Sequence, residues 1–338
     1  MPKGNRVRWG VLSTAKIGVD HVIPAFRKST RAKLVAIASR DTAKARVIAD
    51  EMGIATAYGS YEALLADPSI EAVYNPLPNH LHVPLTLQAV AAGKHVLCEK
   101  PVALDAAEAE KLLAIPRGML VMEAFMVRFH PQWLKARELV QSGALGEVKA
   151  IQSAFSYFLR DPQNVRNIES IGGGGIYDIG CYPTVAGRFL FGDEPKRVVS
   201  LIERDPEMGI DRLASAILDF GGGRRVDFTI GTQMVPYQRV QVLGTSKRLE
   251  ILIPFNAIAG EAMQLRLDDG SRKGEGAGEL ITIEASDQYT NELDAFSQAV
   301  RGEIALPYGP EDAVRNMRIL DALFRSETSG AWEDVKPL

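Results

Sequence analysis

Two segments of the chain carry side chains whose types and spacing suit proton transfer. Lys100 lies just beyond the apolar run His95–Cys98, and Asp178 and Tyr182 lie four residues apart behind the glycines 172–175. In a helix, positions i and i+4 share one face, so the carboxylate and the phenol would form an acid/base pair. Each segment also has an ordinary structural interpretation: a surface ion pair for the first, and a core helix behind a glycine turn for the second. The residues alone leave both interpretations open.

The loop after the first apolar run, Val7–Leu12, favours dinucleotide binding. It places small residues between a strand and a helix, where backbone amides can approach a pyrophosphate. Its pattern is S-x-A-x-x-G rather than G-x-G-x-x-G, and such a pattern also fits an ordinary tight turn. Its place ahead of further βαβ units favours the cofactor interpretation. The candidate cofactor-binding residues here are Ser13, Thr14, Ala15, Lys16 and Ile17.

The second strand ends at Ser39 and Arg40, where an NAD enzyme carries an acid for the ribose 2′-hydroxyl. A hydroxyl and a guanidinium suit a 2′-phosphate instead. NADP(H) is therefore the predicted cofactor, and NAD(H) is the less favoured one. In the alternative, Arg40 is a solvated surface cation and Asp41 binds the ribose. Asp41 is better explained as the N-cap of the next helix.

The order of apolar runs and helical periods predicts the fold class. The first third alternates β-branched runs with segments of helical period, which indicates βαβ units and a doubly wound parallel sheet. The predicted strands are Val7–Leu12, Leu34–Ser39, Ala72–Asn75, His95–Cys98 and Met119–Met122. The predicted helices are Lys16–Lys28, Ala43–Glu51, Tyr61–Leu65, Leu81–Ala92 and Ala106–Ile115. We expect N-caps at Asp41 and Asp105, and helix ends at Gly53 and Gly93.

The second part of the chain has a different pattern. Alternating strands separated by glycine turns, as at Arg225–Ile230, predict an open and mainly antiparallel sheet. Helices are expected at Asn291–Arg301 and Glu311–Glu327, and a polar surface loop at Asp268–Glu279. The length of 338 residues favours two domains, an α/β domain at 1–125 and an α+β domain at 126–338.

Composition excludes several classes of function. The 39 basic and 42 acidic residues give a net charge of −3, and no basic run suggests nucleic-acid binding. No stretch approaches the roughly 20 apolar residues of a membrane span, and Met1–Arg8 lacks the features of a secretory signal. Cys98 and Cys181 are the only cysteines, which suits a reducing compartment. We expect a soluble, cytoplasmic protein.

Five segments, in order, resemble the family of glucose-fructose oxidoreductase and inositol dehydrogenase over nearly the full chain. They are Trp9-Gly10 with its loop, Asn75–His82, Ala92–Pro101, Glu123–Met126 and Gly173–Tyr182. Tyrosine rather than histidine at position 182 is similar to the branch that holds dihydrodiol dehydrogenase and NADP-dependent xylose dehydrogenase.

The resemblance implies a Rossmann domain for NADP and a second domain for substrate binding and oligomerisation. It implies that Lys100 and Tyr182 flank the nicotinamide with Asp178 alongside, and that the Lys100–Pro101 peptide is cis. Relatives often carry a tryptophan where this chain has Val165, next to a candidate arginine. The further cofactor contacts expected are Pro76, Leu77, Asn79, His82, Glu99 and Arg166.

These observations predict a dehydrogenase or reductase that acts on a sugar, polyol, dihydrodiol or dicarbonyl-like small molecule. Tyr182 is expected to be the acid/base, with Lys100 favouring its phenolate and Asp178 as an orienting acceptor. In the alternative, Lys100 itself carries the proton. A dinucleotide-binding sensor without turnover is the alternative function. We expect a homodimer or homotetramer formed through the C-terminal sheet.

A His-x-His pair, His80 and His82, prompts a test for zinc. No third ligand is evident nearby in the sequence, so no metal site is expected. Both histidines lie at the start of the helix expected at Leu81–Ala92, where helix capping and lining of a cleft are the expected roles.

Overall fold

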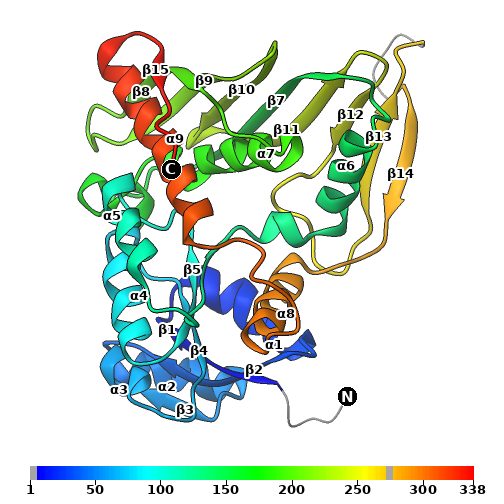
Figure 1. Ribbon diagram of the computed structural model, residues 1–338. Coiled ribbons are helices and arrows are strands. Elements are labelled where there is room, and N and C mark those ends of the chain that lie inside the picture. Colours follow the sequence, from blue (N-terminus) through cyan, green and yellow to red (C-terminus); the bar gives the residue numbers. More distant parts are fainter. Residues whose placement is uncertain (1–5, 272–276) are drawn as a thin grey trace. The chain divides into compact units, whose positions relative to one another are not determined.

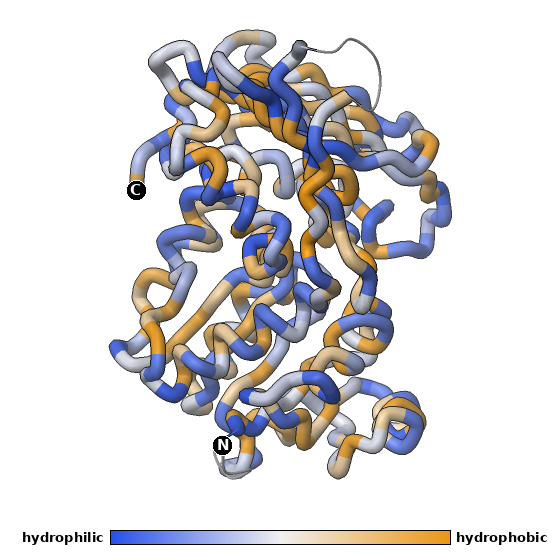
Figure 2. The backbone as a smooth tube through the Cα atoms, turned by 90° about the vertical axis from the view of Figure 1, so that its right-hand side faces the viewer, coloured by the Kyte–Doolittle hydropathy of each residue, from blue (hydrophilic) through white to orange (hydrophobic). Residues whose placement is uncertain are grey.

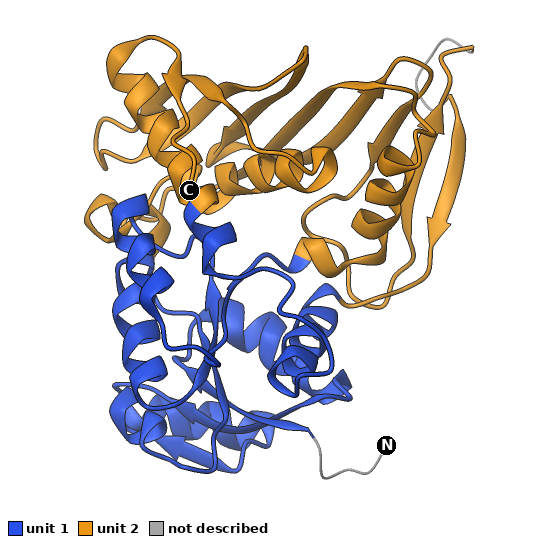
Figure 3. Ribbon diagram, viewed as in Figure 1, with its two compact units in different colours: residues 1–126, 288–314 blue, residues 127–287, 315–338 orange. Residues whose placement is uncertain are grey.

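A computed structural model describes residues 6–271 and 277–338 of the chain (Figure 1). The chain forms two compact units, shown in Figure 3. Unit 1 consists of Met1–Met126 and Gln288–Val314, and unit 2 of Val127–Asp287 and Arg315–Leu338. Part of the N-terminal segment and part of the loop expected at Asp268–Glu279 lie outside the described residues.

The described part of unit 1 contains a six-stranded parallel sheet with the order β3-β2-β1-β4-β5-β6. This confirms the predicted doubly wound sheet. The order reverses between β1 and β4, and ligands of such sheets bind at the carboxyl ends of the strands beside that point. The strands are β1 (Val7–Leu12), β2 (Ala32–Ala38), β3 (Thr56–Tyr58), β4 (Ala72–Asn75), β5 (His95–Glu99) and β6 (Val121–Ala124).

The crossover helices of unit 1 begin and end close to the expected residues. Asp41 and Asp105 accept hydrogen bonds from the amides of Lys44 and Glu108, and Gly53 has a left-handed φ of 68°, so these predicted caps are confirmed. The helical segments are η1 (Gly18–Val22), α1 (Ile23–Lys28), α2 (Thr42–Met52), α3 (Tyr61–Leu65), η2 (Asn79–Leu81), α4 (His82–Ala91), α5 (Ala106–Glu110) and η3 (Lys111–Ala114).

The helix expected at Lys16–Lys28 is not α-helical throughout. After an α-helical start at Lys16 and Ile17, η1 is a π-helix, and α1 follows with Pro24 near its start. Proline has no N–H to bond the carbonyl one turn earlier, and its ring crowds that carbonyl. A wider π turn before the proline accommodates both effects.

A late segment of the chain returns to unit 1 as α8 (Gln288–Val300). The ring of Phe296 lies 5.3 Å from that of Trp9 in β1, and Trp9 Nε1 donates to Ser297 Oγ at 3.1 Å. Arg301 pairs with Glu71 just ahead of β4. The sequence-based division at residue 125 placed α8 with the second domain, because such contacts between distant segments leave no local pattern.

The described part of unit 2 contains a nine-stranded sheet with the order β14-β13-β12-β11-β7-β10-β9-β8-β15. Among its described strand pairs only β10 with β7 is parallel, so the mainly antiparallel prediction is confirmed. The strands are β7 (Val148–Phe158), β8 (Arg197–Arg204), β9 (Asp211–Gly221), β10 (Arg224–Gly231), β11 (Gln233–Gly244), β12 (Arg248–Ile251), β13 (Met263–Asp268), β14 (Glu279–Ile283) and β15 (Glu333–Asp334).

Helices cover one face of this sheet (Figure 1). Polar and apolar residues alternate along its strands (Figure 2), as in β9, where Ala214, Ala216 and Leu218 are buried. The opposite face exposes large apolar side chains, among them Leu201 at 79%. The helical segments of unit 2 are η4 (Met126–Phe129, whose first residue belongs to unit 1), α6 (Pro131–Gln141), η5 (Val165–Asn167), η6 (Glu169–Ile171), η7 (Ile176–Gly180), α7 (Cys181–Phe191) and α9 (Pro310–Ser329, whose residues up to Val314 belong to unit 1).

Candidate active site

The loop after β1 has a strained backbone at the position of the first glycine in the usual fingerprint. Ser13 has a φ of 134°, which side chains rarely adopt. Its Oγ accepts a hydrogen bond from the amide of Ala15 at 3.0 Å, and this bond helps to hold the turn. Thr14 and Ala15 are half-buried, and the loop runs into η1 at the buried Gly18. The predicted loop therefore has the tight, small-residue geometry that a pyrophosphate needs.

At the end of β2 the predicted specificity residues lie as the sequence indicates. Ser39 is buried and its Oγ accepts from the amide of Asp41 at 3.1 Å. Arg40 is exposed, and within the described chain it makes no hydrogen bond or ion pair. The carboxylate of Asp41 is engaged as the cap of α2, with Lys44 N at 3.1 Å. These positions favour Arg40 over Asp41 as the ligand of a ribose substituent.

Glu99 and Lys100 lie at the end of β5. Tyr74 Oη donates to Glu99 Oε1 at 2.5 Å, and the amide of Lys100 donates to Glu99 Oε2 at 3.3 Å. Burial, followed by the charge of Glu99, raises the pKa of Tyr74 well above its usual value, which keeps this phenol a donor. The Lys100–Pro101 peptide is cis, as the resemblance implies.

A buried histidine links two loops of this edge. His82 Nε2 lies 2.6 Å from the carbonyl oxygen of Leu77, and Nδ1 lies 2.7 Å from that of Pro101. Burial lowers the pKa of His82 to about 4. Asn75 donates to the carbonyl of His82 at 3.1 Å, which closes the same loop from the strand side. Pro76 and Leu77 are buried, whereas Asn79 is half-buried.

In unit 2 a carboxylate receives two donors. Asp178 Oδ2 accepts from Tyr157 Oη at 2.5 Å and from Arg166 Nε at 3.0 Å. Asp178 raises the pKa of Arg166, while burial, followed by Asp178, raises the pKa of Tyr157. The arginine side chain is 43% exposed and that of Asp178 is 14% exposed. The structure thus brings the predicted residues Asp178 and Arg166 together.

Tyr182 lies in the first turn of α7, directly after the π-helix η7 that carries Asp178. Its ring contacts Phe255 and Phe155, with centroid distances of 5.2 and 5.7 Å, and the residue is 7% exposed. Packing against two rings holds the phenol in one orientation. Tyr182 belongs to unit 2 and Lys100 to unit 1.

Sequence reasoning missed Tyr157, which contacts the candidate site. The signal was the alternation of β7, where Ile151, Ser153 and Phe155 are buried and the next residue of that face is Tyr157. An alternating strand identifies the face of a residue but not its partner on a distant helix, so the contact with Asp178 needed the structure.

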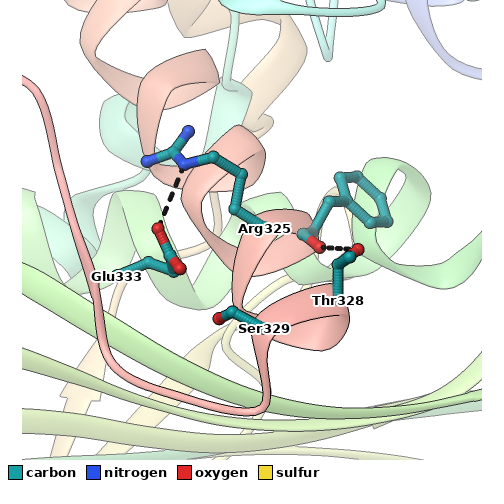
Figure 4. A pocket seen from close by; sticks show the side chains of 5 residues that line it. Arg325, Thr328, Ser329 and Glu333 are labelled. Carbon is teal, nitrogen blue, oxygen red and sulfur yellow. Dashed lines mark hydrogen bonds and ion pairs between the residues drawn. The ribbon is translucent and has the colours of Figure 1, made fainter.

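A separate hollow lies against α9 and β15 in unit 2 (Figure 4). Its volume is about 500 Å³, and Arg325 and Glu333 form an ion pair across it at 3.4 Å. None of the residues predicted to bind cofactor or substrate lines it.

Two further features concern membranes and metals. Within the described ranges, no helix is long and apolar enough to cross a membrane. The same residues contain no group of three or more His, Cys, Asp and Glu that could hold a metal ion.

Comparison with known proteins assigns both halves of this architecture. Residues 7–125 match the model of an oxidoreductase family with an NAD-binding Rossmann fold, and residues 133–250 match the GFO/IDH/MocA C-terminal domain. The chain belongs to the GFO/IDH/MocA oxidoreductase family. The resemblance stated from the sequence is thereby confirmed.

Relatives of this GFO/IDH/MocA protein are named enzymes. D-xylose 1-dehydrogenase (NADP+) 2 of Haloferax volcanii is 40% identical over 96% of this chain and 98% of its own. Trans-1,2-dihydrobenzene-1,2-diol dehydrogenase of Mus musculus is 32% identical over 72% of this chain and 74% of its own. A 3-ketoreductase of Actinomadura kijaniata, solved with NADP and TDP-benzene, has a TM-score of 0.88 at 29% identity and covers 95% of this chain and 98% of its own. The protein is accordingly a dehydrogenase or reductase with an NAD(P)-binding Rossmann fold.

Proposed function

We propose that the protein is an NADP(H)-dependent oxidoreductase that interconverts a hydroxyl and a carbonyl group on a sugar, polyol, dihydrodiol or dicarbonyl-like substrate. The observation that carries the proposal is the set of polar side chains at the carboxyl edge of the parallel sheet of unit 1. The ends of β1, β2 and β5 carry Ser13, Arg40 and Lys100, and this edge is where ligands bind in doubly wound sheets.

The residues at this edge fit the proposed cofactor. Ser13, Thr14, Ala15, Lys16 and Ile17 would hold the pyrophosphate, because the tight turn presents backbone amides ahead of η1. Ser39 and Arg40 would hold the 2′-phosphate, since the guanidinium is exposed and without a partner among the described residues. The other residues proposed to contact or position the cofactor are Pro76, Leu77, Asn79, His82, Glu99, Lys100 and Arg166.

The bound cofactor supplies or accepts a hydride, and the chain must move a proton. We assign that proton to the Oη of Tyr182, whose ring is fixed by two phenylalanines. Lys100 favours the phenolate through its charge, because a nearby cation stabilises the ionised form of a phenol. Asp178 orients the substrate as an acceptor, since its two donors, Tyr157 and Arg166, favour the carboxylate.

The names of the relatives support this substrate class. The xylose dehydrogenase, the dihydrodiol dehydrogenase and the ketoreductase act, by name, on polyhydroxylated or keto compounds. A tyrosine and a carboxylate on adjoining helical segments suit a substrate with several hydroxyl groups. A sensor that binds the dinucleotide without turnover is the alternative, and it would need neither Tyr182 nor Lys100 as an acid/base pair.

We also propose a homodimer or homotetramer in the cytoplasm. The uncovered face of the unit 2 sheet exposes Phe158, Leu201, Val235 and Tyr237, which a second copy of this face can bury. Both cysteines are buried and neither forms a disulfide, which suits a reducing compartment.

The direct test follows NADPH or NADP+ absorbance with purified protein and a panel of sugars, dicarbonyls and dihydrodiols. We expect turnover with at least one substrate class and faster turnover with the phosphorylated cofactor than with NAD(H). Tight binding of NADPH without turnover across the whole panel would favour the sensor.

A further inference from the structure

Asp211 is a buried carboxylate beneath the glycine turn that leads to Asp178. It begins β9, is 2% exposed, and its Oδ2 accepts from the amide of Ile176 at 2.5 Å. A Cβ atom on Gly174 would collide with Asp211 Oδ1, and one on Gly175 would lie 3.3 Å from Oδ2. Gly174 also has a φ of 125°, so only glycine suits this position. The carboxylate and the turn are thus fitted to each other.

The same turn holds both partners of the candidate ion pair. The amide of Gly174 donates to the carbonyl of Arg166 at 2.9 Å, and the amide of Asp178 donates to the carbonyl of Gly174 at 3.0 Å. Gly174 therefore fixes the backbone of Arg166 and the backbone of Asp178, the two partners of the ion pair. Displacement of the turn would change the distance between Arg166 Nε and Asp178 Oδ2.

Charged groups approach Asp211 from several elements. Arg204 on β8 stabilises the charged form of Asp211, whereas Glu327 on α9 destabilises it. The charge of Asp211 in turn helps to raise the pKa of Tyr157 on β7. Arg204 itself bonds Glu327 at 2.7 Å and lies 3.3 Å from Glu169. Burial raises the pKa of Asp211 to about 7, and the bond from Ile176 acts in the opposite direction.

We propose that Asp211 is a positioning residue, which holds the glycine turn through Ile176 and thereby sets the geometry of Asp178, Arg166 and Tyr157. The inference rests on the proposed function only in that it takes Asp178 and Arg166 as part of the site. The charged carboxylate is the stronger acceptor for an N–H group, so the turn is held more firmly when Asp211 is ionised.

Ionisation of Asp211 has opposite effects on stability and on positioning. Because its folded pKa is raised above that of the unfolded chain, the folded state binds more protons, and Asp211 lowers stability as the pH rises from about 4 through 7. As the pH rises through about 7, Asp211 ionises and holds the amide of Ile176 more firmly than the protonated carboxyl does. If Asp211 affected only stability, turnover would not rise as this carboxylate ionises.

The test compares wild type with Asp211→Asn, which keeps an oxygen acceptor for Ile176 but cannot ionise. We expect kcat/KM for the substrate to fall about 10-fold at pH 8, with its inflection near pH 7 lost. The Kd for NADPH should change less than kcat/KM, because Arg166 is only one of the residues proposed to contact the cofactor. The melting temperature of the variant, relative to that of wild type, should rise between pH 5 and pH 8.

The matched control is Asp205→Asn, a buried carboxylate of the same β8–β9 hairpin that bonds Gln233 and the amide of Glu207. We expect this variant to keep the pH profile of turnover. An unchanged kcat/KM and pH profile in Asp211→Asn would overturn the proposal, and so would an equal loss in both variants.

Amide hydrogen exchange separates the failure of this inference from the failure of the proposed function. Peptides covering residues 173–180 should exchange faster in Asp211→Asn than in Asp205→Asn, whether or not a substrate has been found. Unchanged exchange in those peptides would show that Asp211 does not hold the turn. An enzyme without turnover on any substrate, combined with faster exchange, would reject only the proposed chemistry.

Discussion

At the scale of single residues, Tyr182 and Lys100 are expected to divide the work of proton transfer. If Tyr182 moves the proton, Tyr182→Phe should lower turnover about 100-fold or more with little change in NADPH affinity. Lys100→Met should also lower turnover, and its remaining oxidation should need a higher pH, because the phenol loses a neighbouring cation. Steady-state pH profiles of both variants provide the measurement. Full activity in Tyr182→Phe, with loss only in Lys100→Met, would assign the proton to the lysine.

Arg40 is expected to determine the choice between the two dinucleotides. Its guanidinium is exposed at the end of β2, and Asp41 is occupied as a helix cap. Arg40→Ala should weaken NADPH binding about 10-fold or more and leave NADH binding almost unchanged, because only NADPH carries the 2′-phosphate. Fluorescence titration with both cofactors measures this. Equal losses for the two would remove Arg40 from the phosphate site.

The strained serine offers a test of the loop after β1. Ser13→Gly and Ser13→Ala both delete the hydroxyl that accepts from Ala15, but only glycine relieves a φ of 134°. The glycine variant should therefore be more stable than the alanine variant by about 1 kcal/mol, even though glycine adds entropy to the unfolded chain. Urea denaturation of both variants gives the difference. The reverse order of stability would show that this backbone is not strained.

At the scale of elements, His82 joins the loop after β4 to the turn after β5. Both of its ring nitrogens face carbonyl oxygens, at 2.6 and 2.7 Å, and a neutral imidazole carries only one N–H. Its pKa is lowered from 6.5 to about 4, so the unfolded chain takes up a proton first, and the folded state loses stability as the pH falls from 6.5 to 4.

His82→Gln should remove this component, which amounts to about 3 kcal/mol over that range. Its melting temperature should therefore fall less steeply below pH 6.5 than that of wild type. The NADPH Kd should rise, because the loop carrying Leu77 is less firmly held. Calorimetry from pH 7 to pH 4 tests the first statement. If melting temperature depended on pH in the same way in both proteins, the lowered pKa of His82 would be contradicted.

The elements that the sequence predicted well are those with strong local signals. The strand Val7–Leu12 and the caps at Asp41 and Asp105 were correct because an apolar run and a capping side chain are readable within a few residues. The three-residue strand β3 was missed, since it is too short to show a period. The π-helices were missed because a search at 3.6 residues per turn does not detect the wider turn.

At the scale of the whole molecule, the uncovered sheet face of unit 2 is expected to join copies of the chain. Leu201 is 79% exposed on β8, so Leu201→Glu would place a charge in the interface and should shift the protein toward monomers. Val47→Glu on α2 of unit 1, where the valine is 54% exposed, is the matched control and should leave the mass unchanged. Light scattering at micromolar concentration measures both. A wild-type monomer would contradict the proposed oligomer.

Contacts between distant segments within each unit show where sequence patterns stop. The Rossmann fold and the antiparallel sheet were both predictable, because each rests on repeated local patterns. The return of α8 to unit 1 through Trp9 and Phe296 rests on contacts between residues nearly 290 positions apart, and the contact of Tyr157 with Asp178 joins a strand to a helix in the same way. Packing between distant segments leaves no period to read.

The π-helices η1 and η7 have a consequence for how this chain tolerates insertions and deletions. A π turn is an α turn with one additional residue, and η7 carries Asp178 and ends at Gly180, two residues before Tyr182. Removal of one residue between them would restore an ordinary helical turn, but the two residues would then be three rather than four positions apart. The spacing between the two residues, and not only their identities, is thus part of the information that specifies the site.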